Sequence, residues 1–159
     1  MVDARRAWVV FRAVRNLPVS VVALGWARVH GATLTLGDDL FVEASGMPRG
    51  SYGRGGTTLG NVWLHGGLGG PARRRHELKH ADQYALLGTV PFLALYGLNA
   101  LVTGNRPHLN VFERWAGLED GGYARTREGL CEGIYEGTGT AASGSGRTRT
   151  ARTATSSSA

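Results

Sequence analysis

The five residues at positions 76–80, His-Glu-Leu-Lys-His, constrain the fold of this chain more than any other feature. They form the pattern H-E-x-x-H, and the chain from there to Leu87 has no glycine or proline and many good helix formers, which predicts a helix. On a helix, His76 and His80 lie one turn apart on one face, where both imidazoles can bind one Zn²⁺ ion. Glu77 then lies beside the metal, where a carboxylate can act as a general base.

The sequence also offers a third metal ligand. Catalytic zinc sites have three protein ligands and one open position, and His, His and Glu is an attested set. Glu113, within the predicted helix at residues 110–116, can complete that set. A predicted strand at Thr57–Leu64 and a glycine-rich loop at residues 66–71 precede the motif, an order that suits a functional site. Gln83 lies on nearly the same helix face as the histidines, where it can form a hydrogen bond near the metal or satisfy a buried backbone group.

Three short motifs carry a resemblance to a known family. They are the H-E-x-x-H-x-x-Q pattern at residues 76–83, the Leu-Gly pair at 87–88 and the Glu-x-Trp-Ala pattern at 113–116. Over residues 55–123 the chain therefore resembles the small gluzincin-type metallopeptidase-like proteins of bacteria. The resemblance implies the same three zinc ligands, the same general base, and a peptide or protein as substrate.

By the same resemblance, the sheet edge at Leu59–His65 is expected to bind the substrate backbone as an added strand. Two residues depart from the family pattern. Lys79 stands where a small glycine is common, and Gly117 stands where an aspartate often orients a zinc-bound histidine. Loss of such an orienting partner typically lowers affinity or activity about 10–100-fold. Glu119 and Asp120 are candidate substitutes, and a zinc-binding module without catalytic activity stays open as an alternative function.

A long uncharged segment sets a second constraint on the fold. Residues 83–105 contain no charged side chain and are strongly apolar, and about 20 apolar residues suffice to cross a bilayer. A straight span would separate Glu113 from the two histidines by about 30 Å, so a shared zinc ion requires the chain to turn back. Gly88, Pro91 and Gly97 are predicted points for that bend.

We therefore expect a bent pair of short helices over residues 83–105, either buried or in contact with a membrane surface. The basic residues 73–75 and Lys79 just before it can meet anionic headgroups or form a solvated face. A small membrane protein in which H-E-x-x-H arises by chance is the second alternative function.

The remaining pattern predicts an α+β domain. Residues 32–36 and 40–44 alternate in polarity on either side of a Gly-Asp-Asp turn, which predicts a hairpin. Together with the strand at Thr57–Leu64, they would form a small twisted antiparallel sheet beside the H-E-x-x-H helix. Residues 3–16 are interpreted as a short amphipathic helix, and residues 19–30 as a strand or a buried helix turn.

Composition separates residues 1–136 from a low-complexity tail at residues 137–159, and the resemblance implies that residues 1–136 form a zincin-like domain. The tail has no large apolar residue, so we expect it to be disordered and dispensable for stability. It supplies three of the six net positive charges of the 159-residue chain. No aromatic residue lies among its arginines to stack on bases, which argues against a nucleic-acid partner.

Cys131 is the only cysteine, so an internal disulfide is excluded, which is consistent with a reducing compartment. The apolar stretch at residues 19–27 is short for a signal peptide and has no convincing cleavage motif. We therefore expect a protein that is cytoplasmic or peripheral to the inner face of the cell membrane. The other histidines, His30, His65 and His108, are expected to lie outside the metal site.

Overall fold

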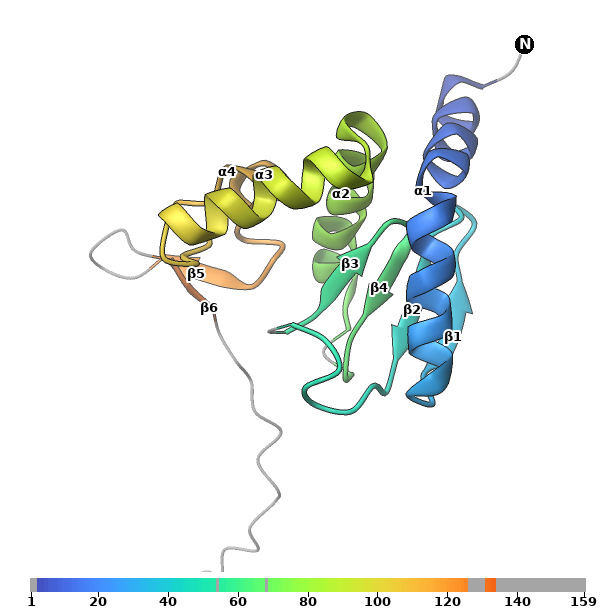
Figure 1. Ribbon diagram of the computed structural model, residues 1–159, viewed down its shortest axis with the longest axis horizontal. Helices are drawn as coiled ribbons and strands as arrows, with labels where there is room; N and C mark the ends of the chain where they lie inside the picture. Colours follow the sequence, from blue (N-terminus) through green and yellow to red (C-terminus); the bar gives the residue numbers. More distant parts are fainter. Residues whose placement is uncertain (1–2, 54, 68, 126–130, 134–159) are drawn as a thin grey trace, which may run out of the picture.

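The computed structural model describes residues 3–53, 55–67, 69–125 and 131–133 of the chain. The predicted disordered tail at residues 137–159 lies outside the described residues. Within them the fold consists of helices α1 to α4, a mixed four-stranded sheet and a separate two-stranded sheet (Figure 1). The predicted α+β class is therefore confirmed.

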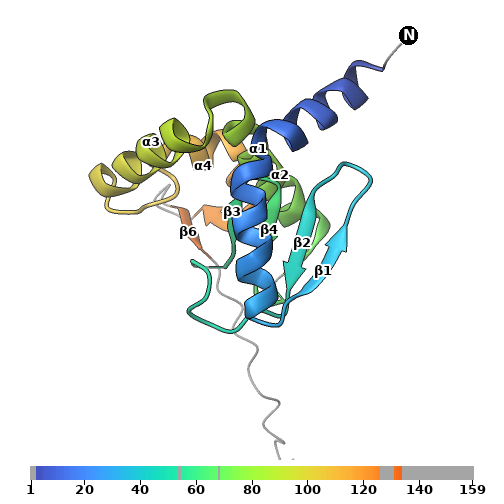
Figure 2. The same ribbon diagram turned by 45° about the vertical axis from the view of Figure 1, so that its right-hand side comes forward.

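Helix α1 is one continuous helix, Ala4–Val29, and it begins where the Asp3 side chain accepts a hydrogen bond from the backbone of Arg5. The predicted division into a helix at 3–16 and a separate element after it is wrong. Pro18 lies inside the helix. A proline within a helix removes one backbone hydrogen bond and bends the axis, and α1 is visibly bent in Figure 2.

The four-stranded sheet has the order β1-β2-β4-β3. Strands β1 (Thr33–Leu36) and β2 (Val42–Ser45) form the predicted antiparallel hairpin. Strand β2 pairs with β4 (Val62–Leu64) in parallel, so the sheet is mixed and the prediction of a purely antiparallel sheet is corrected. A parallel neighbour requires a crossover, and the chain between β2 and β4 supplies it by way of β3 (Thr57–Leu59).

The predicted single strand at Thr57–Leu64 is in fact the hairpin of β3 and β4. Gly60 turns the chain there with φ +61°, and a side chain at this position would collide with α1, since an added Cβ would lie 2.5 Å from the Ser20 hydroxyl. Strand β4 lies inside the sheet and only β3 lies at its edge. Of the residues Leu59–His65, which were expected at the sheet edge, only Leu59 lies in edge strand β3, so that expectation is corrected.

Helices cover both faces of the sheet, which explains why all of β4 is buried. On one face, small residues of α1 such as Ala23 and Ala27 pack against Ala44 of β2 and against β4. On the other face, Trp63 packs against Ala81 of α2 (Pro71–Leu87). Figure 2 shows α1 in front of the sheet and α2 behind it.

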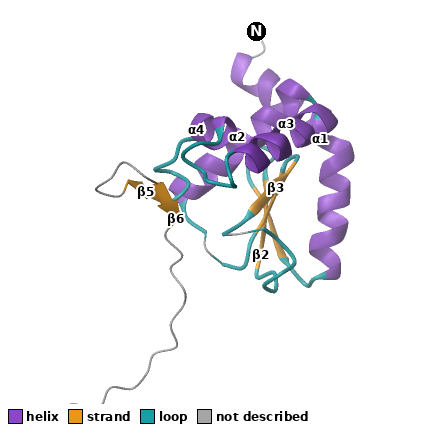
Figure 3. Ribbon diagram, turned by 60° about the vertical axis from the view of Figure 1, so that its left-hand side comes forward, coloured by secondary structure: helices purple, strands orange, loops and turns teal. Residues whose placement is uncertain are grey.

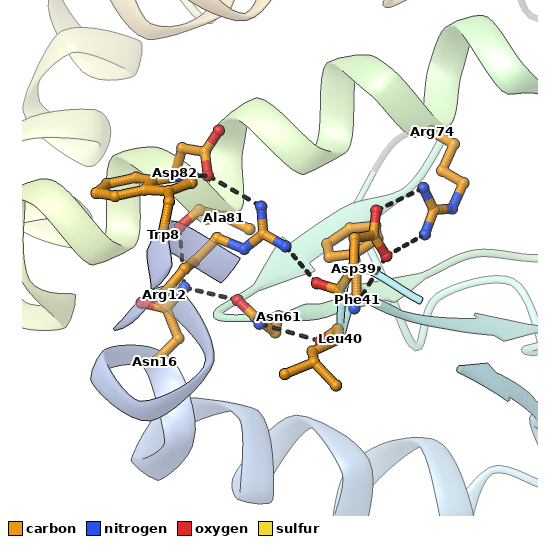
Figure 4. Close-up of polar contacts among 10 residues, drawn as sticks. All are labelled: Trp8, Arg12, Asn16, Asp39, Leu40, Phe41, Asn61, Arg74, Ala81 and Asp82. Carbon is orange, nitrogen blue, oxygen red and sulfur yellow. Dashed lines mark hydrogen bonds and ion pairs between the residues drawn. The ribbon is translucent and has the colours of Figure 1, made fainter. Parts of the chain in front are cut away.

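A polar cluster fixes α2 to α1 and to the β1–β2 turn (Figure 4). Arg12 of α1, almost fully buried, forms an ion pair with Asp82 of α2 at 3.0 Å and donates to the backbone carbonyl of Asp39. Asn16 donates to the backbone carbonyl of Ala81 at 2.8 Å. A buried charge is stable only when it is paired and hydrogen-bonded, so these contacts determine how the helix that carries H-E-x-x-H sits on the domain.

The apolar segment turns back at Gly88, where φ is +84° and α2 ends. Helix α3 (Thr89–Val102) starts at the next residue, and Pro91 stands in its first turn, where no helical N–H is required. The predicted bend is thus confirmed, and residues 83–105 do not form one straight span. Helix α4 (Val111–Ala116) follows, and strands β5 (Tyr123–Arg125) and β6 (Cys131–Gly133) lie apart from the main sheet in Figures 1 and 3.

Helices α1 and α3 expose much apolar surface. In α3 only Phe92 is buried, so the alternative in which this segment is wholly buried is wrong. Among the described helices, α1 alone is long and apolar enough to cross a membrane by length and composition. The exposed large apolar residues of α1 are Val10, Phe11, Val14, Leu17, Val21, Val22, Trp26 and Val29, and those of α3 are Val90, Leu93, Leu95, Leu98, Leu101 and Val102.

Candidate metal centre

Helix α2 buries its functional face. His76, Glu77 and His80 are all more than nine-tenths buried, as the H-E-x-x-H pattern on a helix predicts. Pro71 opens the helix at its first turn and Gly88 ends it, so the motif lies in the middle of the helix, where the backbone hydrogen bonds are complete. The imidazole rings of His76 and His80 meet edge to face, with centroids 4.8 Å apart.

Helix α4 brings the third predicted ligand to the histidines. The side chain of Asn110 caps this short helix by accepting a hydrogen bond from the backbone of Phe112 at 2.9 Å. Asn99 of α3 accepts a further hydrogen bond from the backbone of Val111. Glu113 is buried on the inner face of the helix that these contacts hold in place. Its predicted position near the histidines is confirmed.

Three ligand atoms converge at this place. The Nε2 atoms of His76 and His80 are 3.1 Å apart, and Oε2 of Glu113 lies 3.1 Å from the first and 3.6 Å from the second. Three atoms that bind one tetrahedral ion at about 2.1 Å are about 3.4 Å from one another, close to these distances. Within the described residues this is the only group of three that can hold a metal ion.

The outer nitrogen of His76 shows how that ring is oriented. Its Nδ1 atom lies 2.9 Å from the backbone carbonyl of Gly117. A carbonyl only accepts, so Nδ1 carries the proton and Nε2 keeps its lone pair for a metal. At position 117, where the resemblance leads one to expect an aspartate, a main-chain oxygen of the same residue makes this contact. Asp120, a candidate substitute, instead pairs with Arg75 at 2.8 Å.

His80 is oriented by a side chain. Its Nδ1 atom lies 2.8 Å from Oε1 of Gln83, while Nε2 of Gln83 donates to the backbone carbonyl of Phe112 at 3.0 Å. The second bond fixes the amide, so Oε1 must accept and Nδ1 of His80 must donate. Gln83 therefore has both of the roles considered for it: it orients a candidate metal ligand, and it satisfies a buried backbone carbonyl.

Glu113 is held in the ionised form. Burial raises its pKa, but the nearby imidazoles of His76 and His80 and the hydrogen bond from Tyr96 outweigh burial and leave the pKa well below its usual range. Tyr96 of α3 donates its hydroxyl proton to Oε1, the oxygen that does not face the histidines, at 2.5 Å. The carboxylate therefore offers one oxygen to a metal while the other is occupied.

Glu77 shares a cavity with the three ligands. Its Oε2 atom accepts a hydrogen bond from the hydroxyl of Thr58, in edge strand β3, at 2.8 Å. The cavity has a volume of about 280 Å³ and lies between β3, α2, α3 and α4. Tyr96 and Tyr123 also line it. The carboxylate of Glu77 is thus next to the ligands but not among them.

Sequence reasoning missed Thr58, Tyr96 and Tyr123. For Tyr96 a signal was present, because it is one of few polar residues in an otherwise apolar stretch. Thr58 and Tyr123 carry no such signal. The other histidines lie outside the group of ligands, as expected. His65 bonds to Glu43 at 3.0 Å and His30 to the backbone of Trp26 at 2.9 Å.

Comparisons of this chain with protein-family models, with curated proteins and with solved structures gave no match. The resemblance to gluzincin-type proteins therefore stays a prediction. The geometry itself shows a buried His-His-Glu group that can hold a metal ion.

Proposed function

We propose that the protein is a zinc-dependent hydrolase that cleaves peptide bonds. The observation that carries the proposal is the convergence of His76 Nε2, His80 Nε2 and Glu113 Oε2 beside a cavity that also contains the Glu77 carboxylate. Two imidazoles and one carboxylate suit Zn²⁺, and an ion with three protein ligands keeps a fourth position open. When bound, zinc supplies Lewis acidity toward water and toward a carbonyl oxygen.

The residues of the chain supply the rest of the chemistry. Glu77 accepts a proton from the attacking water and passes it to the leaving amine, the role of a general base and then acid. The hydrogen bond from Thr58 occupies Oε2 of Glu77 and leaves Oε1 for this exchange. Edge strand β3, which lines the cavity, offers unpaired backbone groups to a substrate in extended conformation.

Zinc content and hydrolysis test this proposal together. Metal-purged protein reconstituted with zinc should hold about one ion per chain and cleave members of a peptide mixture, detected by mass spectrometry. Glu77→Gln should retain zinc and lose hydrolysis by a factor of about 100 or more. Glu119→Gln is the matched control, because Glu119 is exposed, and it should remain active. Zinc binding without hydrolysis in the wild type would instead favour a catalytically inactive binding module.

A membrane surface is the second proposed partner, because α1 and α3 expose apolar side chains. On α1 the exposed charged residues are the basic Arg5, Arg6, Arg15 and Arg28, a pattern that suits an anionic bilayer surface. The protein should float with phosphatidylserine vesicles. The double variant Leu98→Glu with Leu101→Glu on α3 should abolish flotation. The control double variant Thr33→Glu with Thr35→Glu on β1 should still float. Equal flotation of both double variants would contradict this contact.

A further inference from the structure

Three consecutive arginines enter the H-E-x-x-H helix, and they have different surroundings. Arg74 forms a bidentate ion pair with Asp39, at 2.7 and 2.9 Å, and Arg75 pairs with Asp120 at 2.8 Å. Arg73 forms no ion pair or hydrogen bond within the part of the chain that the structure describes, and its Nε atom is buried without a partner. Leaving such a donor unpaired away from water is unfavourable. Among the described residues, the guanidinium of Arg73 therefore has no counter-ion.

The Arg73 guanidinium lies in the candidate active site. Arg73 is three residues before His76, and its side chain lines the cavity that contains the three metal ligands and Glu77. It is flanked by glycines of two loops. A Cβ added at Gly55 would lie 2.7 Å from its Nη2 atom, and one at Gly122 would lie 3.7 Å from Nη1. Because Gly55 has no side chain, the guanidinium of Arg73 can lie beside it.

The charges around the cavity also favour the binding of an anion. Among the described residues that line the cavity, Glu77 and Glu113 are the only acidic ones, and Arg73 is the only permanently charged basic one. The two carboxylates already have partners, since Glu77 accepts a hydrogen bond from Thr58, and Glu113 accepts one from Tyr96 and faces the two histidines. Once a divalent ion balances the two carboxylates, the positive charge of Arg73 has no counterpart. A ligand with one negative charge would complete the site.

We propose that Arg73 binds a carboxylate of the substrate, so that the preferred substrates carry a carboxylate close to the bond that is cleaved. This inference rests on the proposed peptidase function. The planar guanidinium can donate two parallel hydrogen bonds to the two oxygens of a carboxylate. Such a group has two sources in a peptide, the free C-terminus and the side chain of an aspartate or glutamate. The first would make the protein a carboxypeptidase, and the second an endopeptidase that selects acidic residues.

Binding measurements on the full-length, zinc-loaded Glu77→Gln protein can test this without turnover. Three matched peptides are titrated by calorimetry: one with a free C-terminus and no acidic residue, its C-terminal amide, and that amide with one internal glutamate. At least one carboxylate peptide should bind about 10–100-fold more tightly than the neutral amide, as expected for a charge-assisted pair. In the background of Glu77→Gln, Arg73→Gln should remove that preference, and Arg73→Lys should retain part of it.

The matched control is Arg75→Gln, which changes the exposed neighbour and should leave the preference intact. Zinc stoichiometry and thermal midpoint, measured on each variant, report whether Arg73→Gln still folds and holds metal. The free and amidated peptides are also compared on the protein that retains Arg73. That comparison does not depend on whether the Arg73→Gln variant folds. Equal binding of all three peptides, no binding of any, or a preference that survives in folded Arg73→Gln would overturn the inference.

The same data separate this inference from the proposed function. A carboxylate preference that depends on Arg73, combined with no hydrolysis by the wild type, would support the binding role and reject the peptidase. Hydrolysis by the wild type without any carboxylate preference would support the peptidase and reject the role of Arg73. A preference for the free C-terminus or for the internal glutamate identifies the source of the carboxylate, and either outcome supports the inference.

Discussion

Among the described residues, two clusters combine buried histidine with glutamate, and one of them forms a group of three that can hold a metal ion. In the first, Nε2 of His65 lies 3.0 Å from Oε1 of Glu43, almost the distance that separates Nε2 of His76 from Glu113. The difference lies in the other ring nitrogen. Nδ1 of His65 accepts a hydrogen bond from the backbone of Gly67 at 3.1 Å, so Nε2 must carry the proton and donate it to Glu43.

In the cluster of His76, His80 and Glu113 the ring nitrogens have the opposite roles. Nδ1 of His76 and Nδ1 of His80 donate to a carbonyl and to an amide oxygen, so both Nε2 lone pairs point to one place. Burial lowers the pKa of His65 despite the nearby Glu43, which keeps its ring neutral and makes its pairing a structural contact. The partner of Nδ1, more than the nearby carboxylate, therefore decides whether a buried histidine can be a metal ligand through Nε2.

The largest expected effect comes from removing histidines of the two clusters. His76→Ala with His80→Ala should reduce zinc from about one ion per chain to none, because one ligand cannot replace three. His65→Gln should retain the full amount, since His65 is not among the ligands. Plasma emission analysis of metal-purged and reconstituted proteins measures both. Equal zinc in the wild type and the double variant would show that the metal binds elsewhere.

A smaller effect should follow from changing the outer partner of His80. Gln83→Leu removes the acceptor of Nδ1 and should weaken zinc binding about 10–100-fold, as loss of an orienting contact does. Gln83→Glu keeps an acceptor oxygen and should bind zinc much more tightly than the leucine variant. Competition with a chromophoric chelator gives both affinities. If the two variants had equal affinities, the outer hydrogen bond would have no part in orienting His80.

The smallest effect is expected in the structural cluster. Glu43→Gln retains an oxygen that can accept the proton of His65, so the free energy of unfolding should fall by less than about 1 kcal/mol. Glu43→Leu leaves that buried donor unpaired and should lower it by about 1–3 kcal/mol. Urea denaturation measures the difference, and zinc content should be unchanged in both variants. A loss of zinc in either one would mean that the two clusters are not independent.

Much of the candidate site could be predicted because its geometry is local. The spacing of His76 and His80 fixes their relation once the helix forms, and Gly88 marks the end of that helix. Tyr96 could not be assigned, because its contact with Glu113 joins residues 17 positions apart and depends on how α3 docks. In the fold, the pattern around Pro18 suggested a break, but the buried face of α1 continues through it as Asn16, Ser20 and Ala23.

The main-chain oxygen at Gly117 limits what mutagenesis and pattern searches can detect. Alanine scanning deletes side chains, and no substitution at this position deletes the carbonyl that His76 bonds to. With φ at +96°, a replacement there would act by moving the oxygen, through backbone strain. A search profile that demands an acidic residue at this place would score the chain as defective although the hydrogen bond is present. Metal-binding competence inferred from side chains alone therefore excludes proteins whose orienting group belongs to the backbone.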